Sequence, residues 1–212
     1  MSPRGLKALE EADVLACEDT SVGARLLAAN GLRRSILRLD EHAPESKLNS
    51  VVAQAAAGKS VVYFSDAGTP GVSDPGSALV DLAYEAGVEV DAIPGPSAVF
   101  TAVMLSGFFA QKLVFLGFLS RKAGAIASEL QPFADSTTTL VFFEAPSRMQ
   151  KTLEIALKTL GDRRVAVCRE MTKAHQEVVR GSLSELVLAG RTFKGECTVV
   201  LEGKRKLRAQ GS

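Results

Sequence analysis

The sequence has little of several residue types that common functional sites need. Of its 212 residues, only two are histidines and three are cysteines, and the cysteines lie far apart. This scarcity speaks against a zinc site and against hydrolase chemistry that needs a histidine base. Cys17, Cys168 and Cys197 stand singly in apolar surroundings, which predicts buried thiols in a reduced, cytoplasmic protein without a metal cofactor.

Net charge and aromatic content are also low. The formal net charge is +1 and aromatic residues make up 6% of the chain. The whole molecule therefore has no strong attraction for nucleic acid, and base stacking cannot be widespread. Any RNA partner would have to be held by a local patch of positive charge.

One long uncharged run does not predict a membrane span. Residues 92–111 carry no charge, but Pro94, Pro96 and Gly107 divide them and leave only residues 97–105 as a helix. Such a helix is too short to cross a bilayer. No signal-peptide pattern precedes it at the N-terminus, and we expect the run to be buried core.

The first half of the chain alternates apolar β-rich runs with helical patterns, which is typical of a parallel α/β sheet. The predicted strands are residues 14–17, 35–39, 60–64 and 89–93, and the predicted helices are residues 21–30, 45–57 and 75–86. Gly31, Gly58 and Gly87 follow these helices where a left-handed end favours glycine. Ser2 and Pro3 predict a further helix at the very start, with no strand before it.

A second α/β series follows a connection at residues 107–112. Its predicted strands are residues 113–118, 138–143, 164–169, 176–180 and 197–201, and capping boxes at residues 147–150 and 182–185 begin two of its helices. The predicted organisation is an N-terminal α/β domain at residues 1–111, a C-terminal α/β domain at residues 112–203, and a disordered basic tail at residues 204–212.

Three polar, glycine-bearing connections follow predicted strands, at residues 17–20, 65–76 and 94–98. Each alone is an ordinary turn, and Asp74–Pro75 is a typical helix start. Ligands of open parallel sheets bind at the carboxyl ends of strands, so three such loops together favour a ligand crevice. The loops match neither phosphate-binding glycine pattern, and no Gly-x-Ser-x-Gly motif occurs, so we expect a ligand without phosphates.

Six motifs together resemble one known family. They are ACEDT (residues 16–20), SDAGTPGVSDPG (65–76), IPGPSA (93–98), GFL (117–119), FFEAPSR (142–148) and CREMTK (168–173). In this order they are similar to the tetrapyrrole methylase superfamily and, within it, to the branch of ribosomal RNA small subunit methyltransferase I. Each motif alone is weak, but the combination is specific and extends nearly to Gly203.

The resemblance implies a two-domain α/β fold that binds S-adenosylmethionine in the cleft between its domains and works as a homodimer. The implied reaction transfers a methyl group to the ribose 2′-oxygen of a cytidine in the 16S RNA of the small ribosomal subunit. By matched position, the resemblance assigns the cofactor site to Gly68, Thr69, Pro70, Val72, Ser97, Ala98, Phe143, Cys197 and Thr198.

The acceptor side needs groups that orient a ribose hydroxyl or take its proton. Charged residues in motif loops at strand ends could do so, and Glu18 and Asp19 are among them. We predict that the acceptor site comprises Glu144, Arg148, Arg169, Glu170 and Lys173. The same carboxylates and arginines could equally form structural ion pairs. The candidates for RNA phosphate contacts are Arg33, Arg34, Arg148, Arg169 and Lys173.

The chain departs from the family at its beginning. Members usually start with one more strand and a Pro-Ile-Gly-Asn-Leu loop, whereas Met1 stands about where their first helix starts. The N-terminal sheet would then lack a central strand, for which we expect weak cofactor binding and poor solubility.

Two other functions remain open at this point. One is a methylase of the same superfamily that acts on a porphyrin or corrin precursor, and the other is a non-catalytic ligand-binding or dimerisation module. The EAPSR and SDAGTPGVSDPG motifs favour the RNA branch, and the intact charged loops speak against the module.

Overall fold

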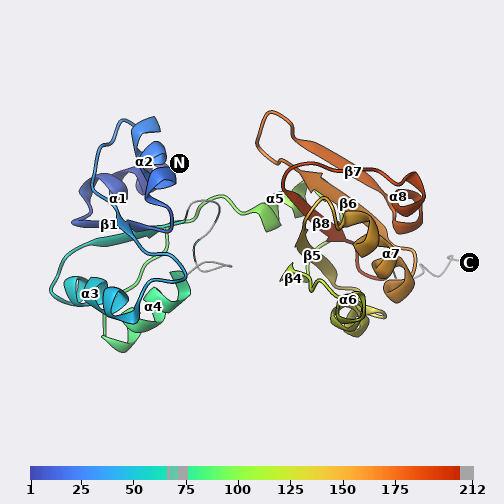
Figure 1. Cartoon of the computed structure of the whole chain (residues 1–212), viewed down its shortest axis with the longest axis horizontal. Coiled ribbons are helices and arrows are strands. Elements are labelled where there is room, and N and C mark those ends of the chain that lie inside the picture. Colours follow the sequence, from blue (N-terminus) through green and yellow to red (C-terminus); the bar gives the residue numbers. More distant parts are fainter. Residues whose placement is uncertain (66–67, 69, 71–75, 206–212) are drawn as a thin grey trace, which may run out of the picture. The chain divides into compact units, whose positions relative to one another are not determined.

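The computed structural model describes residues 1–65, 68, 70 and 76–205 (Figure 1). Contacts within the chain divide it into two compact units, Met1–Ser97 (unit 1) and Ala98–Ser212 (unit 2). Each unit contains its own sheet, with three strands described in unit 1 and five in unit 2. The predicted fold class, two α/β parts in one chain, is confirmed.

The sheet of unit 1 has its most buried strand in the middle. The order is β2 (Leu37–Arg38), β1 (Val14–Cys17) and β3 (Val61–Phe64), and both pairings are parallel. Three of the four β1 residues are buried, as expected for a parallel strand covered on both faces. Cys17 and Phe64 are register partners, so β1 and β3 end at the same edge.

Helices pack on both faces of this sheet. They are α1 (Pro3–Glu11), α2 (Thr20–Ala29), α3 (Glu45–Ala56) and α4 (Gly76–Glu85). Residues of α1 and α2 surround Leu15, whereas residues of α3 and α4 surround Ala16, because successive strand residues point to opposite faces. Figure 1 shows the same two layers around β1.

The helix ends of unit 1 follow the local sequence signals. The hydroxyl of Ser2 accepts a hydrogen bond from the amide of Gly5 at 3.1 Å, which confirms the predicted cap of α1. Gly31, Gly58 and Gly87 have φ angles of 76°, 90° and 69°, where a side chain would strain the backbone. The start predicted at residues 74–75 lies outside the described residues.

The prediction of a strand at residues 89–93 was wrong. These residues are described, and they form no ladder with β1, β2 or β3. Val88 and Val90 do pack against the core around Ala16, so the alternating pattern correctly identified a buried face. Asp91 forms an ion pair with Arg4 of α1. Alternation specifies which side is buried, but it does not supply a neighbouring strand for the backbone to pair with.

The sheet of unit 2 is mixed. Its order is β4 (Leu113–Phe118), β5 (Thr139–Glu144), β8 (Cys197–Leu201), β6 (Arg164–Arg169) and β7 (Glu177–Ser182). The β4–β5 pair is parallel, and the other three pairs are antiparallel. All five predicted strands of this half are present, with small shifts at their ends.

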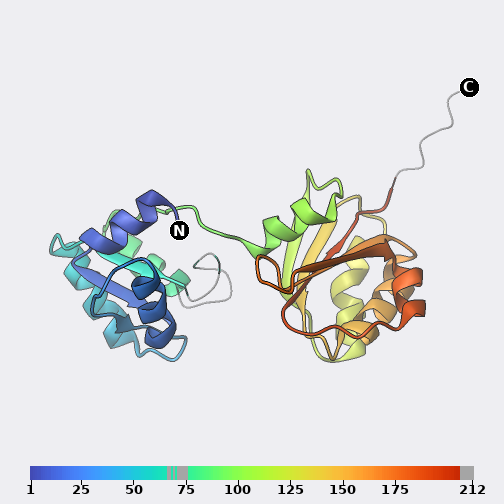
Figure 2. The same ribbon diagram turned by 90° about the horizontal axis from the view of Figure 1, so that it is seen from above.

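Both faces of this sheet are covered, but unequally. One face packs against α6 (Ala123–Leu130), α7 (Met149–Leu160) and α8 (Leu183–Ala189), and a short 3-10 helix spans Gln131–Phe133. Of the described helices, only α5 (Ala98–Ser106) packs against the opposite face. Figure 2 shows α5 on one side of the strands and the other helices beyond them.

The division between the units lies earlier than the boundary expected near Gln111. The reason is α5, because Ala102 and Ser106 are fully buried in unit 2. The uncharged run is also only partly core, which corrects our expectation. Phe100 and Met104 are 61% and 79% exposed, because the short helix presents only one side to the sheet.

The two predicted capping boxes have different outcomes. At α8, the hydroxyl of Ser182 accepts from the amide of Glu185, and the carboxylate of Glu185 accepts in return from the amide of Ser182. At α7 the prediction was wrong, because the helix begins one residue later than expected and its N-cap, Arg148, has no side-chain cap bond. Gln150 instead donates to the carboxylate of Glu154.

Three further predictions concern the basic tail, the cysteines and the absence of a membrane span. Lys204 and Arg205, expected in a disordered tail, pair with Asp135 and Glu202, while residues 206–212 lie outside the described part. The three cysteines are buried, as predicted, and no disulfide bond joins them. None of the helices in the described parts of the chain combines the length and apolar character that crossing a bilayer requires.

Candidate active site

In unit 1 the loops after β1 and β3 begin side by side, because Cys17 and Phe64 are register partners. The first loop leads into α2, where the Asp19 carboxylate accepts bonds from the amides of Ser21 at 2.7 Å and Val22 at 3.4 Å. These two bonds hold the pKa of Asp19 below its ordinary value. The geometry therefore makes Asp19 the N-cap of α2.

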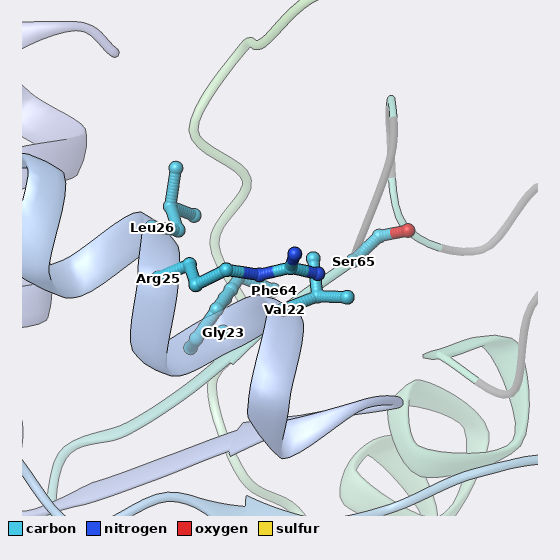
Figure 3. Close-up of a pocket in the computed structure, with 6 residues that line it drawn as sticks. All are labelled: Val22, Gly23, Arg25, Leu26, Phe64 and Ser65. Carbon is cyan, nitrogen blue, oxygen red and sulfur yellow. The ribbon is translucent and has the colours of Figure 1, made fainter.

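A hollow of about 300 Å³ lies between α2 and the end of β3 (Figure 3). Its lining residues are Val22, Gly23, Arg25, Leu26, Phe64 and Ser65. A Cβ on Gly23 would stand 2.7 Å from the Cys17 sulfur and 3.2 Å from the Phe64 ring, so α2 approaches the strand ends closely. In Figure 3 the Arg25 side chain extends past Val22 toward the side of Ser65. The hollow is a mostly apolar recess with one cation.

The two glycine-rich loops of unit 1 approach each other. Gly68 has a φ of 84°, and a Cβ built on it would lie 3.9 Å from the Pro96 carbonyl oxygen. Residues of the SDAGTP and PGPSA segments thus meet main chain to main chain. Such a meeting suits a ligand held by backbone groups, because no side chain intervenes.

The remaining predicted cofactor residues around these loops are only partly described. Pro70 is exposed, and Ser97 is half-buried at the end of unit 1. Ala98 begins α5 in unit 2. Thr69 and Val72 lie outside the described residues, and their assignment stays a prediction.

In unit 2 three strands end in one row across the sheet. Cys197, at the start of β8, is the register partner of Glu144, at the end of β5, and of Arg169, at the end of β6. One step inside, Thr198 pairs with Phe143. The structure therefore brings five predicted site residues to one edge of this sheet, and the loops that leave this edge carry the other three.

Glu144 is buried and fully engaged. Its side chain has no exposed surface, and its carboxylate accepts from the Ala145 amide at 2.8 Å and the Thr152 hydroxyl at 2.6 Å. The Arg148 guanidinium completes the cluster at 3.1 Å. Burial of a carboxylate is costly unless its oxygens have such partners. This arrangement favours a structural role over contact with a substrate.

Arg148 connects two loops. Its guanidinium donates to the carbonyl of Leu119 at 2.8 Å and to that of Ser120 at 2.6 Å, while it pairs with Glu144. The loop after β4 is thereby attached to the loop after β5. Arg148 is 27% exposed, so part of the guanidinium reaches the surface of this edge.

Glu170, Lys173 and Glu196 form a second cluster at the same edge. The Glu170 carboxylate accepts from the Glu196 amide at 2.8 Å and from the Lys173 ammonium at 3.2 Å, and Lys173 also reaches the Glu196 carboxylate at 2.8 Å. The Glu196 amide and then Lys173 hold the pKa of Glu170 below its ordinary value. Bonds to Glu196 and Glu170 raise the pKa of Lys173.

The turn that carries this cluster is strained. Glu170 and Thr172 have φ angles of 46° and 64°, which side chains other than glycine rarely adopt. Backbone strain of this kind persists only where surrounding bonds hold it, and it concentrates at functional sites. Here the bonds of Glu170 to Glu196 and Lys173 hold the turn.

Arg169 lies beside this turn in a network of its own. Its Nε donates to the carbonyl of Lys194 at 3.0 Å, and its guanidinium lies 3.5 Å from the Glu177 carboxylate. Arg191 pairs with the same carboxylate. Arg169 is therefore tied to two neighbouring segments, with about a fifth of its side chain exposed.

The predicted cofactor residues of unit 2 are mostly covered. Cys197 and Thr198 are about 5% exposed, and burial raises the pKa of the Cys197 thiol. The half-buried Phe143 packs its ring 4.9 Å from Phe115 and 5.3 Å from the exposed Phe118. In the described residues, no group of three or more histidines, cysteines or carboxylates is arranged to hold a metal ion.

Sequence reasoning missed the partners that hold these residues. Thr152 and Glu196 carry bonds to Glu144 and Glu170, and the carbonyls after β4 hold Arg148. Gly195 was also missed, although its φ is 77° and a Cβ there would lie 2.5 Å from a Glu170 oxygen. The only local signal was a glycine two residues before a strand, which is common in turns.

The family model described as Tetrapyrrole (Corrin/Porphyrin) Methylases matches residues 1–187. The chain belongs to the tetrapyrrole methylase family. This methylase is 43% identical over 206 residues to "Ribosomal RNA small subunit methyltransferase I" of Mycobacterium tuberculosis, across 95% of this chain and 72% of the relative. Proteins of the same name from Thermotoga maritima and Bacillus subtilis are 40% and 34% identical, across 95% and 96% of this chain and 91% and 70% of the relatives.

Solved structures support the same fold for the methylase. The cobalt precorrin-4 methyltransferase of cobalamin biosynthesis has a TM-score of 0.64 at 18% identity, across 95% of this chain and 88% of that one. Diphthine synthase has a TM-score of 0.66 at 20% identity, across 95% and 84%. At these identities the likeness concerns the fold and not the substrate.

Proposed function

We propose that this methylase transfers a methyl group from S-adenosylmethionine to the ribose 2′-oxygen of a cytidine in 16S ribosomal RNA. The observation that carries the proposal is the 34–43% identity, over nearly the whole chain, to proteins named ribosomal RNA small subunit methyltransferase I. The likeness to a corrin methyltransferase is at 18% identity and supports the fold alone. The RNA branch is therefore favoured over a tetrapyrrole substrate.

S-adenosylmethionine supplies an electrophilic methyl group on a positively charged sulfur. The residues proposed to hold it are Gly68, Thr69, Pro70, Val72, Ser97, Ala98, Phe143, Cys197 and Thr198. The described residues fit such a ligand in two respects. Gly68 and Pro96 expose main-chain groups to each other without a side chain between them. Phe143 offers part of an aromatic ring beside the exposed Phe118, which suits a flat heterocycle.

The electrostatics of unit 2 argue against a strong general base. Lys173 stays protonated at neutral pH because its pKa is raised, so it has no lone pair to accept a proton. Glu170 stays ionised, but its lowered pKa makes it a weak base. Glu144 is buried away from any ligand. We therefore infer that orientation of the ribose supplies most of the rate enhancement.

The five acceptor-side residues then have two kinds of role. Lys173, half exposed, and Arg169 are proposed to hold the RNA strand through its phosphates. Glu170 is a positioning residue that fixes Lys173. Glu144 and Arg148 are positioning residues that join the loops after β4 and β5.

Methyl transfer can be tested directly with the full chain. The protein is incubated with isotopically labelled S-adenosylmethionine and small ribosomal subunits that lack the modification. Digestion and mass spectrometry should then find label in 2′-O-methylcytidine. Parallel reactions contain a tetrapyrrole precursor in place of RNA. Label in the tetrapyrrole and none in RNA would overturn the proposal.

A pair of variants separates RNA holding from chemistry. Lys173→Met should raise the KM for RNA severalfold and change kcat little, because the ammonium acts in binding. Lys158→Met, an exposed lysine on α7, is the matched control and should leave both constants unchanged. Equal effects of the two substitutions would show that Lys173 does not bind the RNA.

The predicted homodimer stays a prediction. Sedimentation of the purified chain across a range of concentrations measures its mass in solution. A monomer at micromolar concentration that still methylates RNA would show that activity does not need a dimer.

A further inference from the structure

A second cluster of positive charge lies in unit 2, on the face of the sheet that α5 covers. Ala166 belongs to the core under α5, and its register partner on β7 is Arg180. Arg164 and Ser182 are also register partners, two positions further along the same two strands. Residues two positions apart on a strand point to the same face, so all four residues lie on the face that α5 covers. Arg164 and Arg180 are diagonal neighbours on adjacent strands. The backbone positions of such neighbours lie roughly 7–8 Å apart.

Phe108 lies beneath the two guanidinium groups. The chain leaves α5, turns at Gly107 with a φ of 61°, and buries the Phe108 ring in the core of this face. The guanidinium carbon of Arg164 lies 4.7 Å from the ring centroid, and that of Arg180 lies 5.3 Å from it. One aromatic ring thus attracts two cations. Both guanidinium groups therefore lie within contact distance of the same ring.

Only one of these two cations is neutralised. Arg164 binds the Glu202 carboxylate through two bonds, one of them 2.6 Å from its Nε, and this contact lowers the pKa of Glu202. No carboxylate among the described residues pairs with Arg180, although its side chain is exposed at the same place. Arg180 therefore keeps a free face and unused N–H donors beside a second guanidinium.

A hollow of about 320 Å³ opens at this point. Its lining residues are Phe108, Arg164, Arg180, Gly181, Ser182 and Glu185. The Glu185 carboxylate is occupied by the capping box of α8, where it accepts from the Ser182 amide at 2.8 Å. The volume lies in the range of small-ligand sites. The hollow is thus lined by one guanidinium that no described carboxylate pairs with, one guanidinium paired with Glu202, and the Glu185 carboxylate.

We propose that this hollow binds a phosphate group of the RNA strand, with Arg180 as the main contact and Arg164 as the second cation. Planar guanidinium groups bind phosphate oxygens through paired N–H donors, and arginine planes also stack on unpaired bases. The proposal rests on the proposed function, since an RNA substrate provides the phosphate. The hollow would hold the strand at a place separate from the row of strand ends that carries Glu144 and Arg169.

A solvated charge on an edge strand is the simplest alternative for Arg180. β7 is the last strand of the sheet, and edge strands often carry charges that prevent pairing with other chains. Such a charge needs neither an aromatic ring beneath it nor a second cation beside it. The ring, the neighbouring Arg164 and the hollow are what favour a phosphate site.

The test measures how tightly the full chain binds a fluorescent single-stranded oligoribonucleotide across a range of salt concentrations. Arg180→Gln should weaken binding about threefold to tenfold at low salt and reduce the salt-dependence slope by about 0.7, as for one lost phosphate contact. Arg180→Lys should keep part of the affinity. Lys158→Gln removes one charge from α7, on the opposite face of the sheet, and should leave the slope unchanged. Equal slopes for Arg180→Gln and Lys158→Gln would overturn the proposal.

A second readout separates this proposal from the proposed function. In NMR spectra of the arginine Nε–H groups, a uridine trinucleotide should shift one resonance that disappears in Arg180→Gln. That shift without methyl transfer to ribosomal RNA would leave the phosphate site standing and refute the proposed function. Methyl transfer without the shift, and with unchanged RNA affinity in Arg180→Gln, would do the reverse.

Discussion

The candidate site edges of the two sheets, one in unit 1 and one in unit 2, are held together by different kinds of contact. In unit 1, Gly68 lies beside the main-chain oxygen of Pro96, and Gly23 lets α2 pack directly on the Cys17 and Phe64 side chains. In unit 2 the loops are joined by buried or half-buried ion pairs around Glu144 and Glu170. The first arrangement depends on the absence of side chains, and the second depends on charge. The two edges should therefore respond differently to volume, charge and pH.

The largest effect should come from the buried charge in unit 2. Glu144→Gln removes the carboxylate that Arg148, Thr152 and Ala145 all contact. Breaking a buried ion pair leaves an uncompensated charge, so the free energy of unfolding should fall by about 3–5 kcal/mol. Urea denaturation measures it. Lys151→Gln, an exposed lysine on α7, should change stability by less than about 0.5 kcal/mol. A loss no larger than this for Glu144→Gln would show that the cluster is not structural.

The edge of unit 1 should instead be sensitive to volume. Gly23→Ala adds a methyl group 2.7 Å from the Cys17 sulfur and 3.1 Å from Ile36, and overpacking of this kind costs about 1–3 kcal/mol. Gly124→Ala is the control, because nothing lies within 4 Å of a Cβ there and the residue is in α6. That substitution should stabilise the protein by up to about 1 kcal/mol. Urea denaturation again measures the free energy of unfolding. If Gly23→Ala left it unchanged, α2 would be able to shift away from the strand ends at no cost.

A smaller effect is expected at Asp19, the charged N-cap of α2 at the unit 1 edge. Asp19→Ala removes the acceptor for the Ser21 and Val22 amides, whereas Asp19→Asn keeps an oxygen in place. The melting temperature should fall by a few degrees at most for alanine, and by less for asparagine. If both variants lost the same amount, the charge of Asp19 would matter more than its hydrogen bonds.

The smallest effect is a pH dependence confined to unit 2. The pKa of Glu170 is lowered from 4.5 in the folded state, so its contribution to stability is present above pH 4.5 and is lost as pH falls through the folded pKa. The raised pKa of Lys173 gives the opposite limit, since its contribution is lost as pH rises through a folded value above 10.5. Melting curves of Glu170→Gln should lack the acid-side part of the wild-type profile. Superimposable profiles would contradict this.

Local signals predicted the helix ends well. Gly31, Gly58 and Gly87 were identified because a left-handed helix end favours glycine, and this preference depends on one residue alone. The pattern Ser-x-x-Glu at Ser182 also gave the correct cap, while a similar pattern at Ser147 did not. The difference arises because other contacts determine where α7 starts, and the four residues of the pattern do not contain them.

Features that need a distant partner were less predictable. The segment at residues 89–93 has the alternation of a strand, yet a ladder requires a neighbour that the pattern does not specify. The motif letters identified Glu144 and Glu170 as important, but not what they contact. Thr152 lies in α7, eight residues after Glu144, and Glu196 lies on a separate loop. The sequence therefore did not indicate the contacts that fix the position of each of these residues.

Gly195 has a consequence for how this protein can vary. The Glu170 carboxylate occupies the space where any other residue would place its first carbon, and the backbone at Gly195 is left-handed as well. Any other side chain at this position would have to push the Glu170 carboxylate away from Lys173 and Glu196, so a library of substitutions should return mainly glycine among clones that keep the Glu170 turn. A single hydrogen atom just before β8 thereby helps to decide which sequences can carry that turn.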